Sequence, residues 1–299
     1  MGAILLDGEA VAARMRTEVT NRVAQLRHDG VTVGLGTILV GDDVPSARYV
    51  AMKHEDSTAM GMYSAGEQLP ATATQHEVLD VIARFNADPM ISAFLVQLPL
   101  PPGLDEEEAL QAVDPAKDVD GLHPVNLGRL VLGAPAQLPC TPAGIVELLH
   151  AYDVPIEGRH AVIIGRGVTI GRPLANLLSL KRPGLNAAVT AVHTGVEPTD
   201  MARIVRTADI VVAAAGRPHI LTPDMVKPGA AVVSAGTTFE GKKLIPDAHP
   251  DVAEVAGWIT PRLGGVGPMT RAMLYRNALR AAELAARGTD LPERSTATP

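Results

Sequence analysis

Residues 161–178 read AVIIGRGVTIGRPLANLL: an apolar run, a glycine-bearing turn and a segment with helical spacing of leucines. The apolar run predicts a buried strand, and the leucines predict a helix with one apolar side. Glycines let a backbone come close to a phosphate, and a helix N-terminus offers free N–H groups to it. The glycines stand at 165, 167 and 171, one residue longer than the usual dinucleotide fingerprint. The stretch alone is as compatible with an ordinary turn between strand and helix as with a nucleotide-binding turn.

The remainder of the chain alternates between helical and strand-like patterns. Helices are expected at 8–28, 46–60, 74–87, 105–112, 199–206 and 269–287, and within 139–152 from a start after Pro142. Strands are expected at 32–41, 62–69, 91–100, 187–193, 209–215 and 230–235, whereas 115–128 and 257–271 read as loops. Such alternation predicts an α/β fold with mostly parallel sheets and right-handed crossovers. Two blocks emerge, 1–140 and 141–268, and the C-terminal segment 269–299 is expected to join the first block.

Composition excludes several classes of protein. The chain has 299 residues, of which 46% are hydrophobic and 20% charged, as in globular proteins. The net charge of −7 argues against a nucleic-acid partner, and no apolar run is long enough to predict a membrane span or a signal peptide. The single cysteine, Cys140, excludes an intramolecular disulfide and suits the reducing cytoplasm. The nine histidines show no metal-ligand spacing, so no metal site is expected.

Three polar segments of the first block could carry chemistry. Tyr49 and Lys53 share one face of a predicted helix, with Ser46, a candidate N-cap or first-turn residue, one turn earlier. A lysine beside a phenol in a dry site can shuttle protons, although an ordinary solvated lysine has the same spacing. Gln97 ends an apolar strand, where α/β sheets bind ligands, but an amide there could equally cap backbone. The segment KDVDG (117–121) holds two carboxylates that suit either the N–H donors of a purine-like edge or a solvated turn.

The second block carries the signals for a cofactor. The strand after the glycine turn ends at His193-Thr194, without the carboxylate that holds the ribose hydroxyls in NAD sites. Arg166 stands inside the turn, and a basic residue without an acid favours NADP over NAD, although a solvated turn arginine would look the same. The glycine- and proline-rich loop 260–270 is poor in side chains and could lie against a planar ligand, or be a plain connector.

Taken together, six stretches resemble the bifunctional methylenetetrahydrofolate dehydrogenase/cyclohydrolase family, also called FolD-like. They are SARYVAMK (46–53), VQLPLP (96–101), DPAKDVDGLHPVNLG (114–128), PCTPAGIVELL (139–149), VIIGRGVTIGRPLANLL (162–178) and GGVGPMT (264–270). The resemblance implies two α/β domains flanking a cleft, the second of them a Rossmann domain, and a homodimer. It implies oxidation of 5,10-methylenetetrahydrofolate to the methenyl form with NADP, then hydrolysis to 10-formyltetrahydrofolate. These reactions belong to one-carbon metabolism and supply purine biosynthesis.

The resemblance also assigns roles on the folate side. Lys53 matches the catalytic lysine, and Tyr49 matches the tyrosine that packs on the folate ring system. Gln97 matches the glutamine that supports the lysine, and Asp120 matches the carboxylate that holds the pterin edge. The residues that match the folate-side loop are Gly264, Gly265 and Pro268.

On the cofactor side, the resemblance assigns six residues. The turn is matched by Gly165, Arg166 and Gly167, the loop near the adenosine phosphate by His193 and Thr194, and a backbone contact to the nicotinamide half by Thr237. Some positions depart from the family pattern: Gly167 and Thr194 each stand where a serine is common, and Leu263 replaces a proline. SAGTT (234–238) replaces a DVGIN-like run, so the departures concern the cofactor half more than the folate half.

Two other interpretations remain open from the residues. A shikimate-type dehydrogenase also pairs a lysine with a Rossmann domain, but its substrate loops differ from KDVDG and GGVGPMT. A nucleotide-sensing or scaffolding protein would keep the glycine turn without a use for Lys53.

Overall fold

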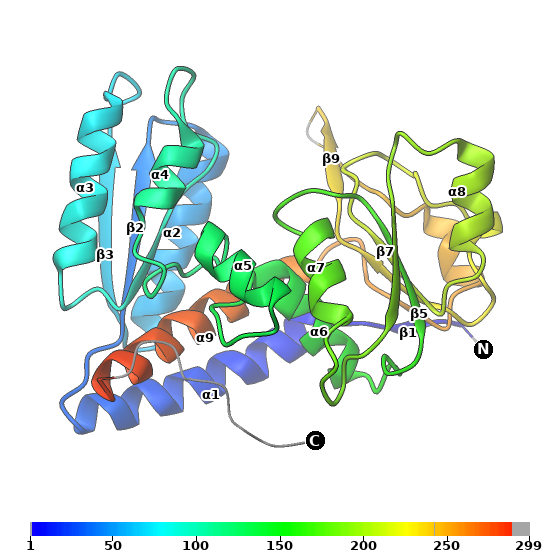
Figure 1. Ribbon diagram of the computed structural model, residues 1–299, viewed down its shortest axis with the longest axis horizontal. Coiled ribbons are helices and arrows are strands. Elements are labelled where there is room, and N and C mark those ends of the chain that lie inside the picture. The colour runs from blue at the N-terminus through cyan, green and yellow to red at the C-terminus, as the bar shows by residue number, and fades with distance from the viewer. Residues whose placement is uncertain (1, 242, 289–299) are drawn as a thin grey trace. The chain divides into compact units, whose positions relative to one another are not determined.

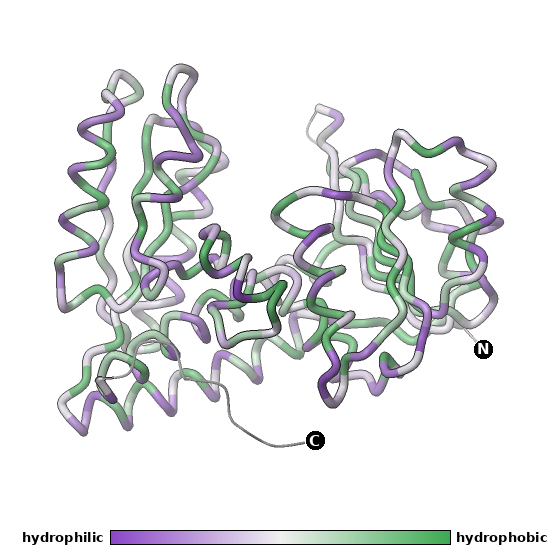
Figure 2. Tube along the Cα trace, viewed as in Figure 1, coloured by the Kyte–Doolittle hydropathy of each residue, from purple (hydrophilic) through white to green (hydrophobic). Residues whose placement is uncertain are grey.

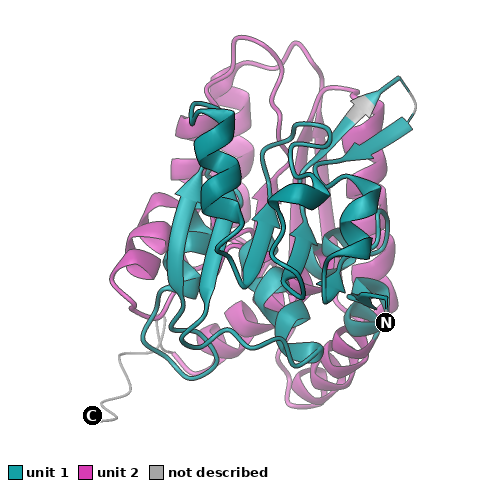
Figure 3. Cartoon of the chain, turned by 90° about the vertical axis from the view of Figure 1, so that its right-hand side faces the viewer, with its two compact units in different colours: residues 1–13, 141–270 teal, residues 14–140, 271–299 magenta. Residues whose placement is uncertain are grey.

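The computed structural model describes residues 2–241 and 243–288, which divide into two compact α/β units. Unit 1 comprises residues 1–13 and 141–270, and unit 2 comprises residues 14–140 and 271–299 (Figure 3). Helices α1 (Gly8–His28) and α9 (Val266–Ala286) each contribute residues to both units. No helix among the described residues is long and apolar enough to cross a membrane.

Unit 1 is built on a six-stranded parallel sheet with the strand order β1-β11-β8-β7-β5-β6. Its strands are β1 (Ile4–Leu5), β5 (His160–Ile164), β6 (Ala188–Val192), β7 (Ile210–Ala213), β8 (Ala231–Ser234) and β11 (Trp258–Ile259). The intervening helices are α6 (Cys140–Ala151), α7 (Gly171–Leu178), α8 (Pro198–Val205), η1 (Pro223–Met225) and η2 (Pro250–Glu254), and β9 (Thr237–Glu240) forms a hairpin with β10 (Lys243–Pro246). The inner strands β5 and β7 are buried apart from the half-buried His160 that begins β5, and their residues are mostly hydrophobic (Figure 2), as expected for a parallel sheet covered on both faces.

Unit 2 contains a three-stranded parallel sheet with the order β3-β2-β4. Its strands are β2 (Gly34–Val40), β3 (Tyr63–Leu69) and β4 (Ala93–Val96), and its further helices are α2 (Val44–Ala59), α3 (Gln75–Ala87), α4 (Glu106–Ala112) and α5 (Pro124–Val131) (Figure 1). Both α2 and α3 contact β2. A capping box between Thr74 and Glu77 starts α3, whose Phe85 packs edge-on against Phe94 of β4.

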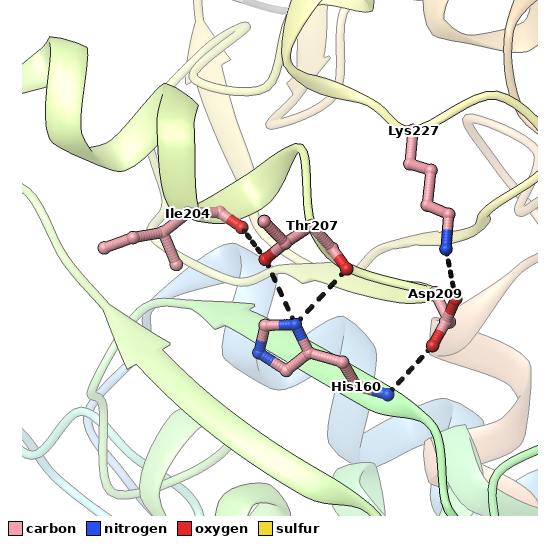
Figure 4. A network of polar contacts seen from close by, with 5 residues as sticks. All are labelled: His160, Ile204, Thr207, Asp209 and Lys227. Carbon is pink, nitrogen blue, oxygen red and sulfur yellow. Dashed lines mark hydrogen bonds and ion pairs between the residues drawn. The ribbon is translucent and has the colours of Figure 1, made fainter.

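The amino-terminal edge of the unit 1 sheet is held by a polar network (Figure 4). Asp209 accepts hydrogen bonds from the His160 backbone N–H at 3.0 Å and from Lys227 Nζ at 2.7 Å. These bonds lower the pKa of the Asp209 carboxyl, the Lys227 bond most of all. The His160 ring lies 3.2 Å from the Thr207 hydroxyl. The network joins the starts of β5 and β7, at the opposite edge from the glycine turn.

The α/β class and the parallel sheets are confirmed, and several local predictions are corrected. Asp43, not Ser46, caps α2: its side chain accepts the Ser46 N–H at 2.9 Å, and Ser46 lies in the first turn, as the other alternative had it. The expected loop 115–128 contains the start of α5, which the His123 side chain caps. The strand expected at 91–100 is shorter: β4 covers Ala93–Val96, and Pro99, which cannot donate to a sheet, follows it.

The compact units of the structure and the predicted blocks divide the chain differently at the N-terminal segment and at the start of the last helix. Residues 1–13 lie in unit 1 because β1 pairs in parallel with β11. The expected loop 257–271 contains β11 and the first turns of α9, so that the helix starts at Val266 and not at 269.

Candidate functional site

A lysine and a glutamine from different elements of unit 2 meet directly. Lys53 lies on α2 and donates from Nζ to Oε1 of Gln97 at 3.1 Å. Gln97 directly follows β4, and its own Nε2 donates to the carbonyl oxygen of Leu98 at 2.7 Å. This second bond orients the amide so that its oxygen faces the lysine. Tyr49 lies one turn before Lys53 on the same helix and is 57% exposed, so its ring is available to a ligand.

The two carboxylates of the 117–121 segment have different environments. Asp118 is buried, and its Oδ1 accepts the backbone N–H groups of Gly121 at 3.0 Å and Leu122 at 3.3 Å. Its Oδ2 accepts from the His123 backbone N–H at 2.8 Å and from Asn126 Nδ2 at 2.9 Å. Asp118 therefore organises the loop and has no free oxygen for a ligand.

Asp120, unlike Asp118, has carboxylate oxygens that are free to accept hydrogen bonds from a ligand. Its carboxylate makes no hydrogen bond with any residue that the structure describes, although the residue is only partly exposed. Burial raises the pKa of this carboxyl, the positive charge of Lys53 opposes that rise, and Asp118 adds to it. A half-buried acid without a partner, beside a lysine, suits a ligand that brings its own N–H donors.

The loop that carries Asp120 is braced by distant segments of the chain. Asn277 of α9 is buried and donates from Nδ2 to the carbonyl oxygens of Val119 and Leu138, both at 2.9 Å. Gly121 has a φ of +71°, and a Cβ there would collide with Leu138. Cys140 is buried and donates to the Val119 carbonyl oxygen, and burial raises the pKa of its thiol, which marks it as a structural group.

Side-chain hydrogen bonds from the residues that follow Lys53 hold helix α2 against neighbouring elements. The His54 ring bonds Ser64 Oγ of β3 at 2.6 Å and Thr37 Oγ1 of β2 at 2.8 Å. Burial lowers the pKa of His54 and so favours its neutral ring. Towards its C-terminal end, α2 is joined to α9 because Tyr275 donates to Asp56 Oδ2 at 2.9 Å. Burial, with Asp56 beside it, raises the pKa of the Tyr275 phenol.

The glycine turn of unit 1 has the shape that a phosphate-binding turn requires. Gly165 has a φ of +138°, and a Cβ there would collide with the carbonyl oxygen of Ala214. A Cβ on Gly171, the first residue of α7, would collide with the Gly165 carbonyl oxygen. No side chain caps α7. Arg172 already donates its N–H to the Gly167 carbonyl oxygen at 3.1 Å and Pro173 has no N–H, so in this first turn the Gly171 N–H is left to a ligand or to water. This cradle fits a dinucleotide phosphate.

The other cofactor candidates lie at the same edge of the sheet. Gly165 donates its N–H to Val192, the last residue of β6, which precedes His193 and Thr194. Arg166 and Thr194 are exposed. Gly167 is exposed too, and a Cβ there would meet nothing within 4 Å, so the glycine is not sterically required. Thr237 is exposed and begins β9.

The candidate folate-side loop belongs to unit 1, whereas Lys53, Gln97 and Asp120 belong to unit 2. Gly264 has a φ of +82°, and its carbonyl oxygen accepts the Glu9 N–H at 3.0 Å. Gly265 and Pro268 are buried, and Pro268 lies in the first turn of α9, where proline is tolerated. Their joint contact with one folate stays a prediction, as does the contact of each candidate residue with a ligand.

Sequence reasoning did not single out the groups that hold these sites in place. Asn277, Asp118 and Asp247 each bind backbone groups of a site loop. Asp118 belongs to the same KDVDG segment as Asp120, and only its contacts distinguish the two carboxylates. Nothing in the local sequence pattern marks Asn277 or Asp247.

Comparisons with known proteins match nearly the whole chain. The family model for the catalytic domain of tetrahydrofolate dehydrogenase/cyclohydrolase matches residues 6–120, and the model for its NAD(P)-binding domain matches residues 139–286. The bifunctional protein FolD of Syntrophotalea carbinolica is 55% identical over 287 residues, which is 96% of this chain and 98% of that one.

Two solved structures are similar throughout. The bifunctional enzyme FolD, a methylenetetrahydrofolate dehydrogenase/cyclohydrolase from Campylobacter jejuni, has a TM-score of 0.90 at 38% identity and covers 95% of this chain and 99% of its own. The FolD of Trypanosoma brucei, solved with NADP and an inhibitor, has a TM-score of 0.89 at 39% identity and covers 96% of this chain and 99% of its own.

Proposed function

Since the chain belongs to the tetrahydrofolate dehydrogenase/cyclohydrolase family, we propose that unit 2 holds the folate and unit 1 the NADP of a bifunctional enzyme. The enzyme oxidises 5,10-methylenetetrahydrofolate to the 5,10-methenyl form with NADP and hydrolyses that product to 10-formyltetrahydrofolate. It thus serves one-carbon metabolism. Family membership favours this reading over a shikimate-type dehydrogenase or a non-catalytic scaffold.

The observation that carries the folate site is the bond from Lys53 Nζ to Gln97 Oε1, with the unpartnered Asp120 in the same unit. An amide oxygen only accepts, and both the ammonium and the amine form of a lysine can donate to it. Gln97 can therefore hold Lys53 in place while the lysine gains and loses a proton. This suits a shuttle that takes a proton as water attacks the methenyl carbon.

Tyr49 and Asp120 would position the folate for both reactions. The exposed Tyr49 ring offers a flat surface for the folate ring system, and Asp120 can accept N–H donors of the pterin edge. Such donors would stabilise the carboxylate that burial disfavours. Gly264, Gly265 and Pro268 would complete the folate-side surface, since a backbone without side chains can lie flat against a ring.

In unit 1, Gly165 and Gly167 with the uncapped start of α7 would hold the NADP phosphates. Arg166, His193 and Thr194 would contact the adenosine phosphate, and the Thr237 backbone would contact the nicotinamide half. When bound, NADP accepts the hydride of the first reaction. The exposed Arg166 and the absence of a carboxylate at the end of β6, where His193, Thr194 and Gly195 follow the strand, support a preference for NADP over NAD.

Two substitutions of Lys53 test the shuttle. Lys53→Met should lower cyclohydrolase turnover by about 10²- to 10⁴-fold, followed by the loss of methenyltetrahydrofolate absorbance. Lys53→Arg keeps the positive charge but cannot give up a proton at neutral pH, so it should fail as well. If the arginine variant hydrolyses methenyltetrahydrofolate at the wild-type rate, Lys53 acts through its charge and the shuttle is wrong.

We further propose a cytoplasmic homodimer. The family resemblance supports the dimer, and the lone buried Cys140 suits a reducing compartment. Light scattering of the purified protein tests the oligomeric state: a monomer at micromolar concentration would contradict it.

A further inference from the structure

A buried carboxylate lies beneath a loop at the carboxyl end of the unit 1 sheet. Asp247 directly follows β10 and is fully buried. Its Oδ2 accepts the backbone N–H groups of Ala215 at 2.6 Å and Gly216 at 2.9 Å, and its Oδ1 accepts that of Arg217 at 2.9 Å. Three consecutive N–H groups that follow β7 therefore converge on one side chain.

The same carboxylate touches two other segments. A Cβ on Gly236 would collide with Oδ2 of Asp247, and the Asp247 N–H donates to the Gly236 carbonyl oxygen at 3.1 Å. Thr238 of β9 donates to the Gly216 carbonyl oxygen at 2.9 Å. The hairpin β9–β10 and the loop after β7 are thus joined through Asp247.

The loop that Asp247 holds lies directly against the glycine turn. The Ala214 N–H donates to Ile164, the last residue of β5, at 2.8 Å. The carbonyl oxygen of Ala214 is the group that leaves no space for a Cβ on Gly165. A shift of residues 214–217 would therefore change the surface beside Gly165.

Burial raises the pKa of the Asp247 carboxyl, and its three N–H donors act against that rise. Both oxygens accept, so the geometry suits the carboxylate, which has no proton to place among donors. A neutral amide could offer one oxygen only, and its NH₂ group would face another donor.

We propose that Asp247 is a positioning residue for the dinucleotide site: it sets the loop 214–217 against the glycine turn and so determines the affinity for NADP. This inference rests on the proposed function of unit 1. It predicts that loss of Asp247 weakens NADP binding while hydrolysis of methenyltetrahydrofolate, which consumes no NADP, is spared.

The test compares Asp247→Asn with Asp209→Asn, the same change at the opposite edge of the same sheet. Asp209 also accepts a backbone N–H and a second donor, so its loss controls for general destabilisation of unit 1 (Figure 4). Gly236→Ala disturbs the same contact without changing Asp247, because the added Cβ would displace the Asp247 carboxylate. Fluorescence of Trp258, the single tryptophan, reports whether unit 1 is folded in each variant.

Asp247→Asn and Gly236→Ala should raise the KM and the calorimetric Kd for NADP by about tenfold or more, with kcat at saturating NADP changed less than about threefold. The cyclohydrolase rates of Asp247→Asn and Gly236→Ala should equal that of the wild type. The NADP affinity of Asp209→Asn should also be unchanged. The proposal is wrong if folded Asp247→Asn binds NADP like the wild type, or if Asp209→Asn weakens NADP binding equally. A wild-type protein that does not bind NADP would instead overturn the proposed function.

Discussion

Replacing each aspartate of the 117–121 segment with asparagine should have opposite consequences at positions two residues apart. Asp118 is buried and accepts four hydrogen bonds, whereas the Asp120 carboxylate accepts none from the described residues. We therefore expect Asp118→Asn to lower the free energy of unfolding. Asp120→Asn should leave it unchanged and weaken the binding of the folate.

The magnitude at Asp118 follows from its donors. Asparagine offers one oxygen, so whichever way its amide points, two donors now served by the other oxygen lose their acceptor. On one side these are the backbone N–H of His123 and Nδ2 of Asn126. Each buried donor without an acceptor costs about 1–3 kcal/mol, so the two together cost about 2–6 kcal/mol. That is a large part of a typical stability of about 5–15 kcal/mol.

At Asp120 no donor would lose an acceptor, so no comparable loss of stability is expected. Burial raises the folded-state pKa of this carboxyl, so its contribution to stability falls as the pH rises from the carboxyl's ordinary pKa through the raised one. Asparagine carries no charge and removes no hydrogen bond, so unfolding should change by less than about 1 kcal/mol at pH 7. Loss of a charged acceptor should weaken folate binding about 10- to 100-fold.

Urea unfolding followed by circular dichroism measures stability, and calorimetric titration with methenyltetrahydrofolate measures binding. Each variant serves as the control for the other, because both carry the same chemical change in one loop. An Asp118→Asn protein as stable as the wild type would refute the role of Asp118 in holding the loop. An Asp120→Asn protein that loses several kcal/mol, or binds folate normally, would refute the division between the two carboxylates.

Further predictions concern the glycine turn and the supports of α2. Gly165→Ala should weaken NADP binding by at least about tenfold in calorimetry, because a Cβ meets backbone there, whereas Gly167→Ser should bind NADP at least as well as the wild type; equal affinities of the two variants would contradict this. Burial lowers the pKa of His54 below its ordinary 6.5, so the fold favours the neutral ring and loses stability as the pH falls below about 6.5. Urea unfolding of His54→Asn should show a smaller loss between pH 7.5 and 5.5 than the wild type, and an equal loss would argue against this source. Tyr275→Phe removes the bond to Asp56 and should lower the free energy of unfolding by about 1–3 kcal/mol; an unchanged urea midpoint would contradict that cost.

The helices and strands that carry the candidate site were predictable because their signals are local. Helical period placed Tyr49 and Lys53 on one face of α2, and an apolar run ending in prolines placed Gln97 at a strand end. Helix α5 was missed because its cap is the His123 side chain, an uncommon capping residue. Ser46 was a reasonable N-cap by residue type, but the acceptor for its N–H is Asp43.

By itself the sequence determined the α/β class, the glycine turn and the family. Periodicity and motif spacing encode which residues are buried and which backbone conformations are allowed. Only the tertiary structure decided which polar group is available to a ligand and which supports a loop. Asp118 and Asp120 look alike in KDVDG, and Asn277 lies 158 residues from the Val119 carbonyl that it binds. A buried polar group that lacks a hydrogen-bond partner costs free energy, so its role depends on which partners the fold brings to it. Those partners come from distant parts of the chain, and the local sequence does not contain them.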